Sequence, residues 1–370
     1  FDAKAQGGAT IGAAVAQNHD PYQAIGTYQI VTLTDAWQHF SLPFMATASD
    51  ANSRVNFDLA QLERTIWLDN VSLKPLNPVG LAAGESLEAN SIARLPRSQW
   101  QGYSEQRIRD LVQFYADTES AFYGGMHDTL QSIGAKMLNT GTANFNDNLP
   151  SAYAMAQTDY VDNHIYWDHP SWPNGIAWTA DNWVINNKAW VNAPFDGLFD
   201  KALTAVKGKP FTLTEFREVT PNRYEAEGPL LMATFANLQD WDGIFLFSYA
   251  PDADAYSDEA PTMGGFFDLV GNPIQLSIMP VAARIFQRQQ NTPAPVETLL
   301  PFSAEQIADS TTVGWRGSTK DYLVDQYGVN AAAAFGSRLR ISDTLAPIST
   351  TVDLPTPNGP LYQSAGGQLR

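Results

Sequence analysis

Short apolar runs alternate with helical patterns between residues 104 and 290, and this alternation constrains the fold more than any other feature of the chain. Apolar runs separated by helical patterns are typical of parallel strands that are buried on both faces. The predicted strands are Ala135–Asn139, Tyr160–Tyr166, Pro210–Phe216 and Gly243–Tyr249. The predicted helices are a long one that follows Ser104 and ends near Gly134, and shorter ones at Phe195–Val206, Tyr224–Gln239 and Ile274–Gln290. Because a closed (β/α)8 barrel takes about 250 residues and eight strands, this region is predicted to form about half of one.

Residues 1–75 are predicted to form an antiparallel β-sandwich. Short alternating runs that are bounded by turns rich in Asp, Asn and Ser are typical of such sheets. The runs are Thr27–Leu33, Trp37–Phe44, Arg54–Leu59 and Thr65–Leu73. A sandwich usually takes about 100 residues, so we expect this one to lack its first strands. The chain begins at Phe1 rather than Met, and we expect it to be a piece of a longer protein.

The composition excludes several classes of function. The 370 residues carry a formal net charge of −17 and include no cysteine. A chain this acidic lacks the positive field that attracts phosphate backbones, so nucleic acid is not an expected partner. The absence of cysteine excludes a disulfide scaffold, a thiolate metal site and a Cys nucleophile. No run approaches the length of about 18 apolar residues that would span a membrane, so no membrane partner is expected.

The end of one predicted strand carries the best candidate for catalysis. In a parallel α/β barrel the working residues lie at the C-terminal ends of the strands. Glu215 lies at such an end, where a carboxylate can act as a nucleophile; the alternative is a surface Glu with no role. His164 and Tyr166 share one face of the preceding strand by the two-residue period. Both side chains can hydrogen-bond a carboxylate, which would hold Glu215 ionised and oriented.

Tryptophans are concentrated in the loop-rich part of the same region. They are Trp167, Trp172, Trp178, Trp183, Trp190 and Trp241. Exposed indoles are unfavourable in water unless a ligand stacks on them, and the apolar faces of sugar rings suit indole well. For any single Trp, packing against the barrel is the preferred interpretation. For the cluster we expect a glycan site.

The order of these residues resembles a known enzyme family. A strand with Asn-His164-x-Tyr166, a long loop and a strand that ends in Thr-Glu215-Phe are similar to the last strands of clan A retaining glycoside hydrolases, the family 5-like (β/α)8 enzymes. Residues 162–170, 214–227 and 238–249 resemble large bacterial members in which a carbohydrate-binding module is inserted into the barrel. Near the N-terminus, residues 33–40, 55–59 and 66–73 resemble the second half of carbohydrate-binding modules of the family 4 and 9 type.

The resemblance implies a multidomain enzyme with three incomplete parts. Residues 1–76 would be a partial β-sandwich of the carbohydrate-binding type, 77–290 strands five to eight of a (β/α)8 TIM barrel, and 291–370 a partial β-rich region. The protein would be extracellular or periplasmic and would cleave a β-linked glycan without a metal or cofactor. Glu215 carries over as the nucleophile, with His164 and Tyr166 as its catalytic supports. The implied sugar contacts, with Trp172 added from the aromatic cluster, are Trp167, His169, Trp172, Asn222, Tyr224 and Tyr249.

One part of the family's pattern is missing. Retaining hydrolysis needs two carboxyl groups about 5–5.5 Å apart. In the clan, the acid/base is the Glu of an Asn-Glu pair that ends strand four, and no Asn-Glu pair occurs in the 370 residues. Glu85 and Glu88 are candidates only by default, so we expect the acid/base outside this chain, either in a parent protein or in a separate polypeptide that supplies the N-terminal half-barrel. The alternative function is a non-catalytic polysaccharide-binding protein, in which Glu215 is incidental.

Overall fold

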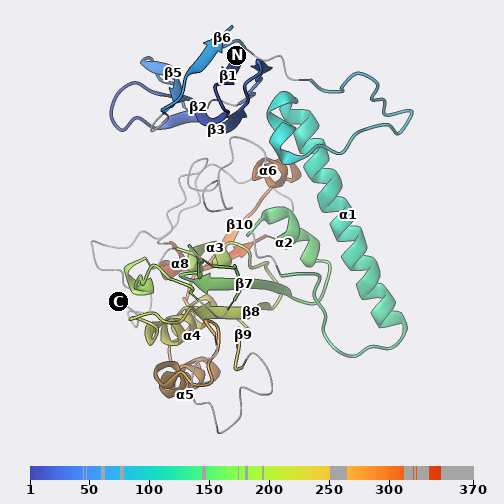
Figure 1. Ribbon diagram of the computed structural model, residues 1–370. Coiled ribbons are helices and arrows are strands. Elements are labelled where there is room, and N and C mark those ends of the chain that lie inside the picture. The colour runs from blue at the N-terminus through green and yellow to red at the C-terminus, as the bar shows by residue number, and fades with distance from the viewer. Residues whose placement is uncertain are drawn as a thin grey trace. The chain divides into compact units, whose positions relative to one another are not determined.

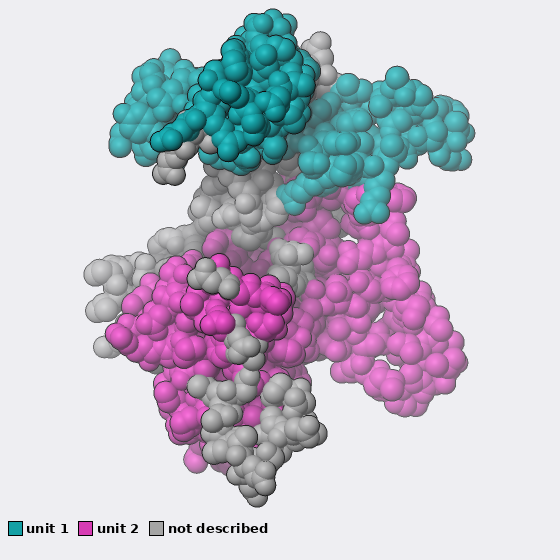
Figure 2. Space-filling view, in the orientation of Figure 1, with its two compact units in different colours: residues 1–111, 312–314 teal, residues 112–311, 315–370 magenta. Residues whose placement is uncertain are grey.

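The computed structural model describes most of the chain. The described residues are 1–44, 46, 48–59, 63–75, 79–143, 147–173, 175–179, 182–193, 196–250, 265–311, 320, 322 and 333–342. They form two compact units, one that takes in residues 1–111 and one that takes in residues 112–311 (Figure 2). The domain boundaries predicted at residues 76 and 290 fall inside these units and stay predictions.

The first unit contains two antiparallel sheets. One has the strand order β4-β1-β6 and the other the order β3-β2-β5. The strands are β1 (Asp2–Ala5), β2 (Ala9–Gln17), β3 (Ala24–Leu33), β4 (Gln38–His39), β5 (Ser53–Asp58) and β6 (Ile66–Asp69). Buried residues of both sheets share one apolar core, to which β1 contributes Ala3 and Ala5, β2 contributes Ile11 and β3 contributes Leu33. The strands predicted after residue 26 are confirmed in position, although the second of them is only two residues long.

Strands β1 and β2 were not predicted as individual strands. Strand β2 is rich in alanine, which is depleted in strands, so local propensity gave no signal. The strand forms nonetheless because it lies between β3 and β5 and is buried over most of its length. Gly12 permits close packing there, since a Cβ at this position would lie 2.7 Å from the Tyr28 hydroxyl oxygen.

A 3-10 helix, η1 (Arg97–Gly102), precedes the long helix α1 (Glu105–Ser132). The Ser104 hydroxyl accepts a hydrogen bond from the Arg107 amide at 3.2 Å, which caps the helix N-terminus. Gly134, at φ 82°, follows its C-terminal end. The predicted helix is confirmed. Its apolar face is only partly buried: Ile108, Leu111 and Val112 are buried, whereas Phe114, Phe122 and Met126 are exposed.

The second unit is built around three parallel strands, in the order β7-β8-β9 (Figure 1). They are β7 (Val161–Trp167), β8 (Phe211–Glu218) and β9 (Gly243–Leu246). The helices and the 3-10 turn around them are α2 (Leu149–Met155), η2 (Trp190–Asn192), α3 (Leu198–Ala202), α4 (Glu227–Gln239) and α5 (Pro273–Gln287). The described residues contain no closed barrel, and the half-barrel stays a prediction.

The strand predicted at Ala135–Asn139 is wrong. Residues 135–139 form no strand: the Asn139 carbonyl accepts from the Asp159 amide at 3.0 Å, and an isolated parallel bridge to Asp162 forms only later, at Ala143. Side chains take the place of a regular ladder: the Asp159 carboxylate accepts from the Asn139 amide at 2.9 Å, and the Thr140 hydroxyl donates to the Tyr160 carbonyl at 2.7 Å. The apolar run was therefore too weak a signal for a strand.

The described part of residues 291–342 belongs to the core of the second unit. It contains β10 (Glu297–Leu300), α6 (Ala304–Asp309), α8 (Ala333–Gly336) and β11 (Arg338–Ile341), and β10 pairs with β11 in parallel. Leu300 and Ile341 join the same buried cluster as Phe211 and Leu213 of β8. No helix in the described part of the chain is long and apolar enough to cross a membrane.

Candidate active site

Glu215 reaches the polar face of the sheet through a bulge in β8. Asn163 of β7 pairs with Leu213, and the next residue, His164, pairs with Glu215, so Thr214 is an extra residue in the ladder. In a regular strand Glu215 would share the face of Leu213, which is fully buried in the apolar core. The bulge instead turns the carboxylate toward His164, and bulges commonly re-aim a side chain in this way beside active sites.

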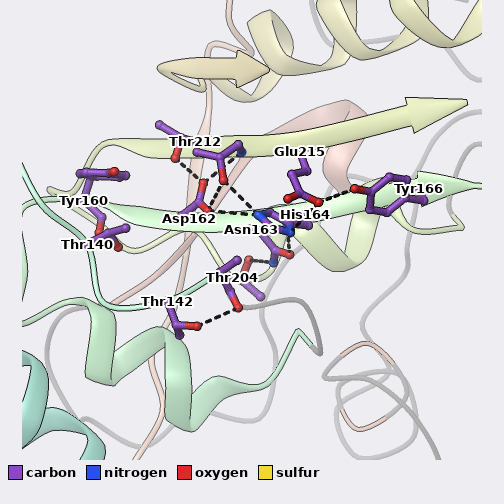
Figure 3. Close-up of polar contacts among 12 residues, drawn as sticks. Thr140, Thr142, Tyr160, Asp162, Asn163, His164, Tyr166, Thr204, Thr212 and Glu215 are labelled. Atoms are coloured by element: carbon purple, nitrogen blue, oxygen red, sulfur yellow. Dashed lines mark hydrogen bonds and ion pairs between the residues drawn. The ribbon is translucent and has the colours of Figure 1, made fainter. Parts of the chain in front are cut away.

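Tyr166 and His164 both contact one oxygen of Glu215 (Figure 3). The Tyr166 hydroxyl donates a short hydrogen bond to Glu215 Oε2. His164 Nδ1 lies 3.2 Å from the same oxygen. Burial raises the pKa of Tyr166, and so does its hydrogen bond to the carboxylate, so the phenol keeps its proton and remains a donor. The structure thus brings together the three residues that the sequence singled out.

Asp162 lies on the other side of His164, and the sequence analysis missed it. It is only 3% exposed. Its carboxylate accepts hydrogen bonds from the Thr212 hydroxyl at 2.6 Å, the Thr214 amide at 3.1 Å and the Thr214 hydroxyl at 2.5 Å. The sequence does contain a pattern that points to Asp162, because the two-residue strand period that groups His164 with Tyr166 also places Asp162 on their face.

Aromatic rings form a continuous series of contacts that begins at Tyr166. Neighbouring ring centroids in this series are 5.3 to 5.7 Å apart. In order, the series comprises Tyr166, His169, Trp178, Trp172 and Phe266. Trp178 is 64% exposed, so the series extends from Tyr166, beside Glu215, to solvent. Trp183 joins it through Phe266, at 5.7 Å.

Other tryptophans of the predicted cluster serve packing. Trp190 and Trp241 are buried in the core, which agrees with packing as the preferred interpretation for any single Trp. Trp167 stacks on Trp190 with centroids 5.3 Å apart, and its Nε1 donates to the Lys188 carbonyl at 2.9 Å. These three residues pack within the unit, while Trp172 and Trp178 belong to the aromatic series that begins at Tyr166.

The remaining predicted sugar contacts differ in exposure. Asn222 is 3% exposed, and its amide group donates to the Lys188 carbonyl and accepts from the Tyr224 amide. Its side chain therefore holds two loops together, and we do not propose it further as a sugar contact. Tyr224 and Tyr249, in contrast, are 38% and 50% exposed.

Glu85 and Glu88, the two default candidates for the acid/base, both have a lowered pKa. The amides of Ala82 and Ala93 donate to Glu85, as does Arg107, and these hydrogen bonds lower the pKa of its carboxyl. The pKa of Glu88 is also lowered, chiefly by the Ser86 hydroxyl. A carboxyl group with a lowered pKa is a poor proton donor near neutral pH. Neither residue has the character of a general acid.

The described residues therefore offer one oriented carboxylate rather than a pair. Within the described part of the chain, the only carboxylate besides Glu215 that contacts His164 or Tyr166 is Asp162. No group of three or more His, Asp or Glu residues in that part of the chain is arranged to hold a metal ion. Comparisons of the sequence with protein-family models and with curated proteins, and of the structure with solved structures, found no match.

Proposed function

We propose that this chain carries the nucleophile of a retaining β-glycoside hydrolase, and that the nucleophile is Glu215. One observation carries the proposal: Glu215, turned by a bulge onto the polar face of a parallel strand, is held by the Tyr166 hydroxyl and by His164 Nδ1 at 3.2 Å. In such a reaction the carboxylate attacks the anomeric carbon, the bond to the leaving oxygen breaks, and a glycosyl ester forms that water later hydrolyses.

The contacts also distinguish the two oxygens of Glu215. Both Tyr166 and His164 contact Oε2, and no described residue makes a hydrogen bond to Oε1. A carboxylate held through one oxygen keeps the lone pairs of the other available for attack. Oε1 is therefore the attacking oxygen of the proposed reaction, and Oε2 is the oxygen that positions it.

The acid/base residue is proposed to come from another part of a complete (β/α)8 barrel. Two observations support a missing neighbour: the apolar side chains of Phe114, Phe122 and Met126 on α1 are exposed, and Phe245 on the last strand of the sheet is 56% exposed. Large apolar side chains that are exposed together on one element can mark an interface. The partner is a further half-barrel, and the complete enzyme is proposed to act on an extracellular or periplasmic β-linked glycan.

The proposal can be tested on the chain as it is. A dinitrophenolate leaving group departs without protonation, so an activated substrate bypasses the general acid, which is not found among the described residues. We expect 2,4-dinitrophenyl 2-deoxy-2-fluoro-β-glycosides of the gluco, galacto and manno series, incubated with the full chain, to yield a covalent adduct with at least one sugar. Intact mass and peptide mapping should place it on Glu215. No adduct with any sugar, or an adduct on another residue, would refute the assignment.

Polysaccharide binding without hydrolysis is the second candidate function. Trp37 and Trp67, 48% and 41% exposed, flank Lys4, whose Nζ lies 5.1 and 4.9 Å from their ring centroids. Exposed indoles on the outer face of a sheet can stack on sugar rings. This function predicts that immobilised polysaccharide retains the full chain, that Trp37→Ala removes the retention, and that the chain forms no glycosyl adduct.

A further inference from the structure

The Thr214 hydroxyl lies between Asp162 and His164 and can give its single proton to only one of them. It is 2.5 Å from Asp162 Oδ2 and 3.0 Å from His164 Nε2. The other contacts of Asp162 come from two donors, the Thr212 hydroxyl and the Thr214 amide. Because an ionised carboxylate can only accept, the Thr214 proton points to Asp162, and the Thr214 oxygen must accept from His164.

The direction of this hydrogen bond places a proton on His164 Nε2. The other ring nitrogen, Nδ1, lies 3.2 Å from Glu215 Oε2, an oxygen that already accepts from Tyr166. In a neutral imidazole with its proton on Nε2, Nδ1 carries a lone pair that would face the carboxylate. A second proton must therefore lie between Nδ1 and Oε2.

We infer that Asp162, acting through Thr214, is a positioning residue that keeps the Nε2 proton on His164 and thereby makes His164 an imidazolium beside an ionised Glu215. Asp162 Oδ2 lies 3.7 Å from His164 Nε2, so the cation has a carboxylate on each side. Asp162 and Glu215 are the only titratable groups in contact with His164 in the described part of the chain. An imidazolium donates a charge-assisted hydrogen bond to Glu215, which a neutral ring with its proton on Nε2 cannot do.

This inference deepens the proposed function, since it explains how the nucleophile is held ionised. The protonation state itself is independent of any reaction with sugar. It can be measured directly by nitrogen NMR of the full chain labelled with ¹⁵N-histidine, because there are only five histidines. His164→Gln identifies the resonances of His164. We expect both ring nitrogens of His164 to be protonated at neutral pH, and an unprotonated Nε2 would overturn the inference.

Asp162→Asn supplies a sharper test because it reverses the hydrogen bond. The asparagine oxygen can still accept from Thr212, while its NH₂ group donates to the Thr214 oxygen, which frees the Thr214 proton for His164 Nε2. We expect a neutral ring with its proton on Nδ1. Thr212→Val is the matched control, since it removes a hydroxyl from Asp162 without touching His164, and its spectrum should match the wild type. An unchanged tautomer in Asp162→Asn would contradict the inference.

A kinetic readout connects the tautomer to the nucleophile. Adduct formation should slow about 10- to 100-fold in Asp162→Asn and Thr214→Val, because Glu215 then accepts from a neutral ring in place of a cation, and Thr214→Ser should restore the rate. Wild-type rates in Thr214→Val, with an intact fold by circular dichroism, would show that Asp162 does not act through Thr214. If the wild type forms no adduct, the proposed hydrolase function fails, while the NMR result still decides the protonation of His164.

Discussion

Glu215→Gln should abolish the release of dinitrophenolate from unsubstituted 2,4-dinitrophenyl β-glycosides. The wild-type chain is expected to release about one equivalent in a burst, because the first step needs no acid whereas hydrolysis of the ester needs a general base. Glutamine has nearly the same shape and can still accept from Tyr166, but its amide is not a nucleophile. The rate of the burst should therefore fall by at least about 10⁴-fold, as expected when a nucleophile is removed. Stopped-flow absorbance measures it.

Azide and a surface variant control this experiment. Azide attacks the glycosyl ester without a general base, so it should convert the wild-type burst into steady turnover and have no effect on Glu215→Gln. Glu105→Gln removes an exposed carboxylate from the first turn of α1 and should behave like the wild type. A burst of wild-type size in Glu215→Gln would refute Glu215 as the nucleophile, whereas the absence of a burst in the wild type would favour the polysaccharide-binding function.

The central contacts of the site could be predicted from sequence because they follow from local rules. His164 and Tyr166 are two residues apart in a strand, which puts them on one face whatever the rest of the fold does. Glu215 was predicted to end the next strand, but β8 continues to Glu218, so Glu215 lies within the strand and the rule about strand ends did not place it. The contacts of His164 and Tyr166 at Oε2 bear out the first rule.

The bulge and the hydrogen bonds behind the site could not be predicted. In strict alternation Glu215 faces the apolar core, and only the extra residue, Thr214, turns it to the polar side. The position of a bulge depends on pairing across the sheet rather than on local sequence. Asp162 was passed over for a different reason, since a buried carboxylate becomes meaningful only when its donors, here two threonines, are located.

The fold shows the same division between local and non-local information. The capped helix α1 was recognised from its sequence, whereas the exposure of Phe114 and Phe122 depends on what packs against them. Strand β2 went unrecognised because alanine has low strand propensity, and its place between two other strands overrides that preference.

Glu218 should make the second unit less stable as the pH rises from about 5 to 8. Its side chain, at the end of β8, is 1% exposed. Oε2 accepts from the Gly228 amide at 2.8 Å, and Oε1 has no hydrogen-bond partner among the described residues. The neighbouring Arg217 donates instead to the backbone oxygen of Asp268 at 2.5 Å. Burial, reinforced by the negative charge of Glu227, raises the pKa of Glu218 to about 8.

The direction of the effect follows from proton binding. Between the ordinary pKa of 4.5 and the raised value near 8, the folded chain holds a proton on Glu218 that the unfolded chain has lost. The stabilisation by this proton is complete below the ordinary pKa and is lost as the pH rises through the folded value. The full shift corresponds to an upper limit of about 5 kcal/mol in the free energy of unfolding at pH 8.

Glu218→Gln should remove this loss, because the amide is neutral at every pH and can still accept from Gly228. The variant should unfold at a higher denaturant concentration than the wild type at pH 8 and at about the same concentration at pH 5, with a gain of about 2–5 kcal/mol at the higher pH. The pKa of Asp147 is also raised by burial, to about 6, so its contribution has the same sign but is lost by about pH 6. Because Asp147 is present in both proteins, its contribution cancels when the free energies of unfolding of variant and wild type are subtracted. A difference that does not grow between pH 6 and 8 would show that Glu218 is not protonated in the folded chain.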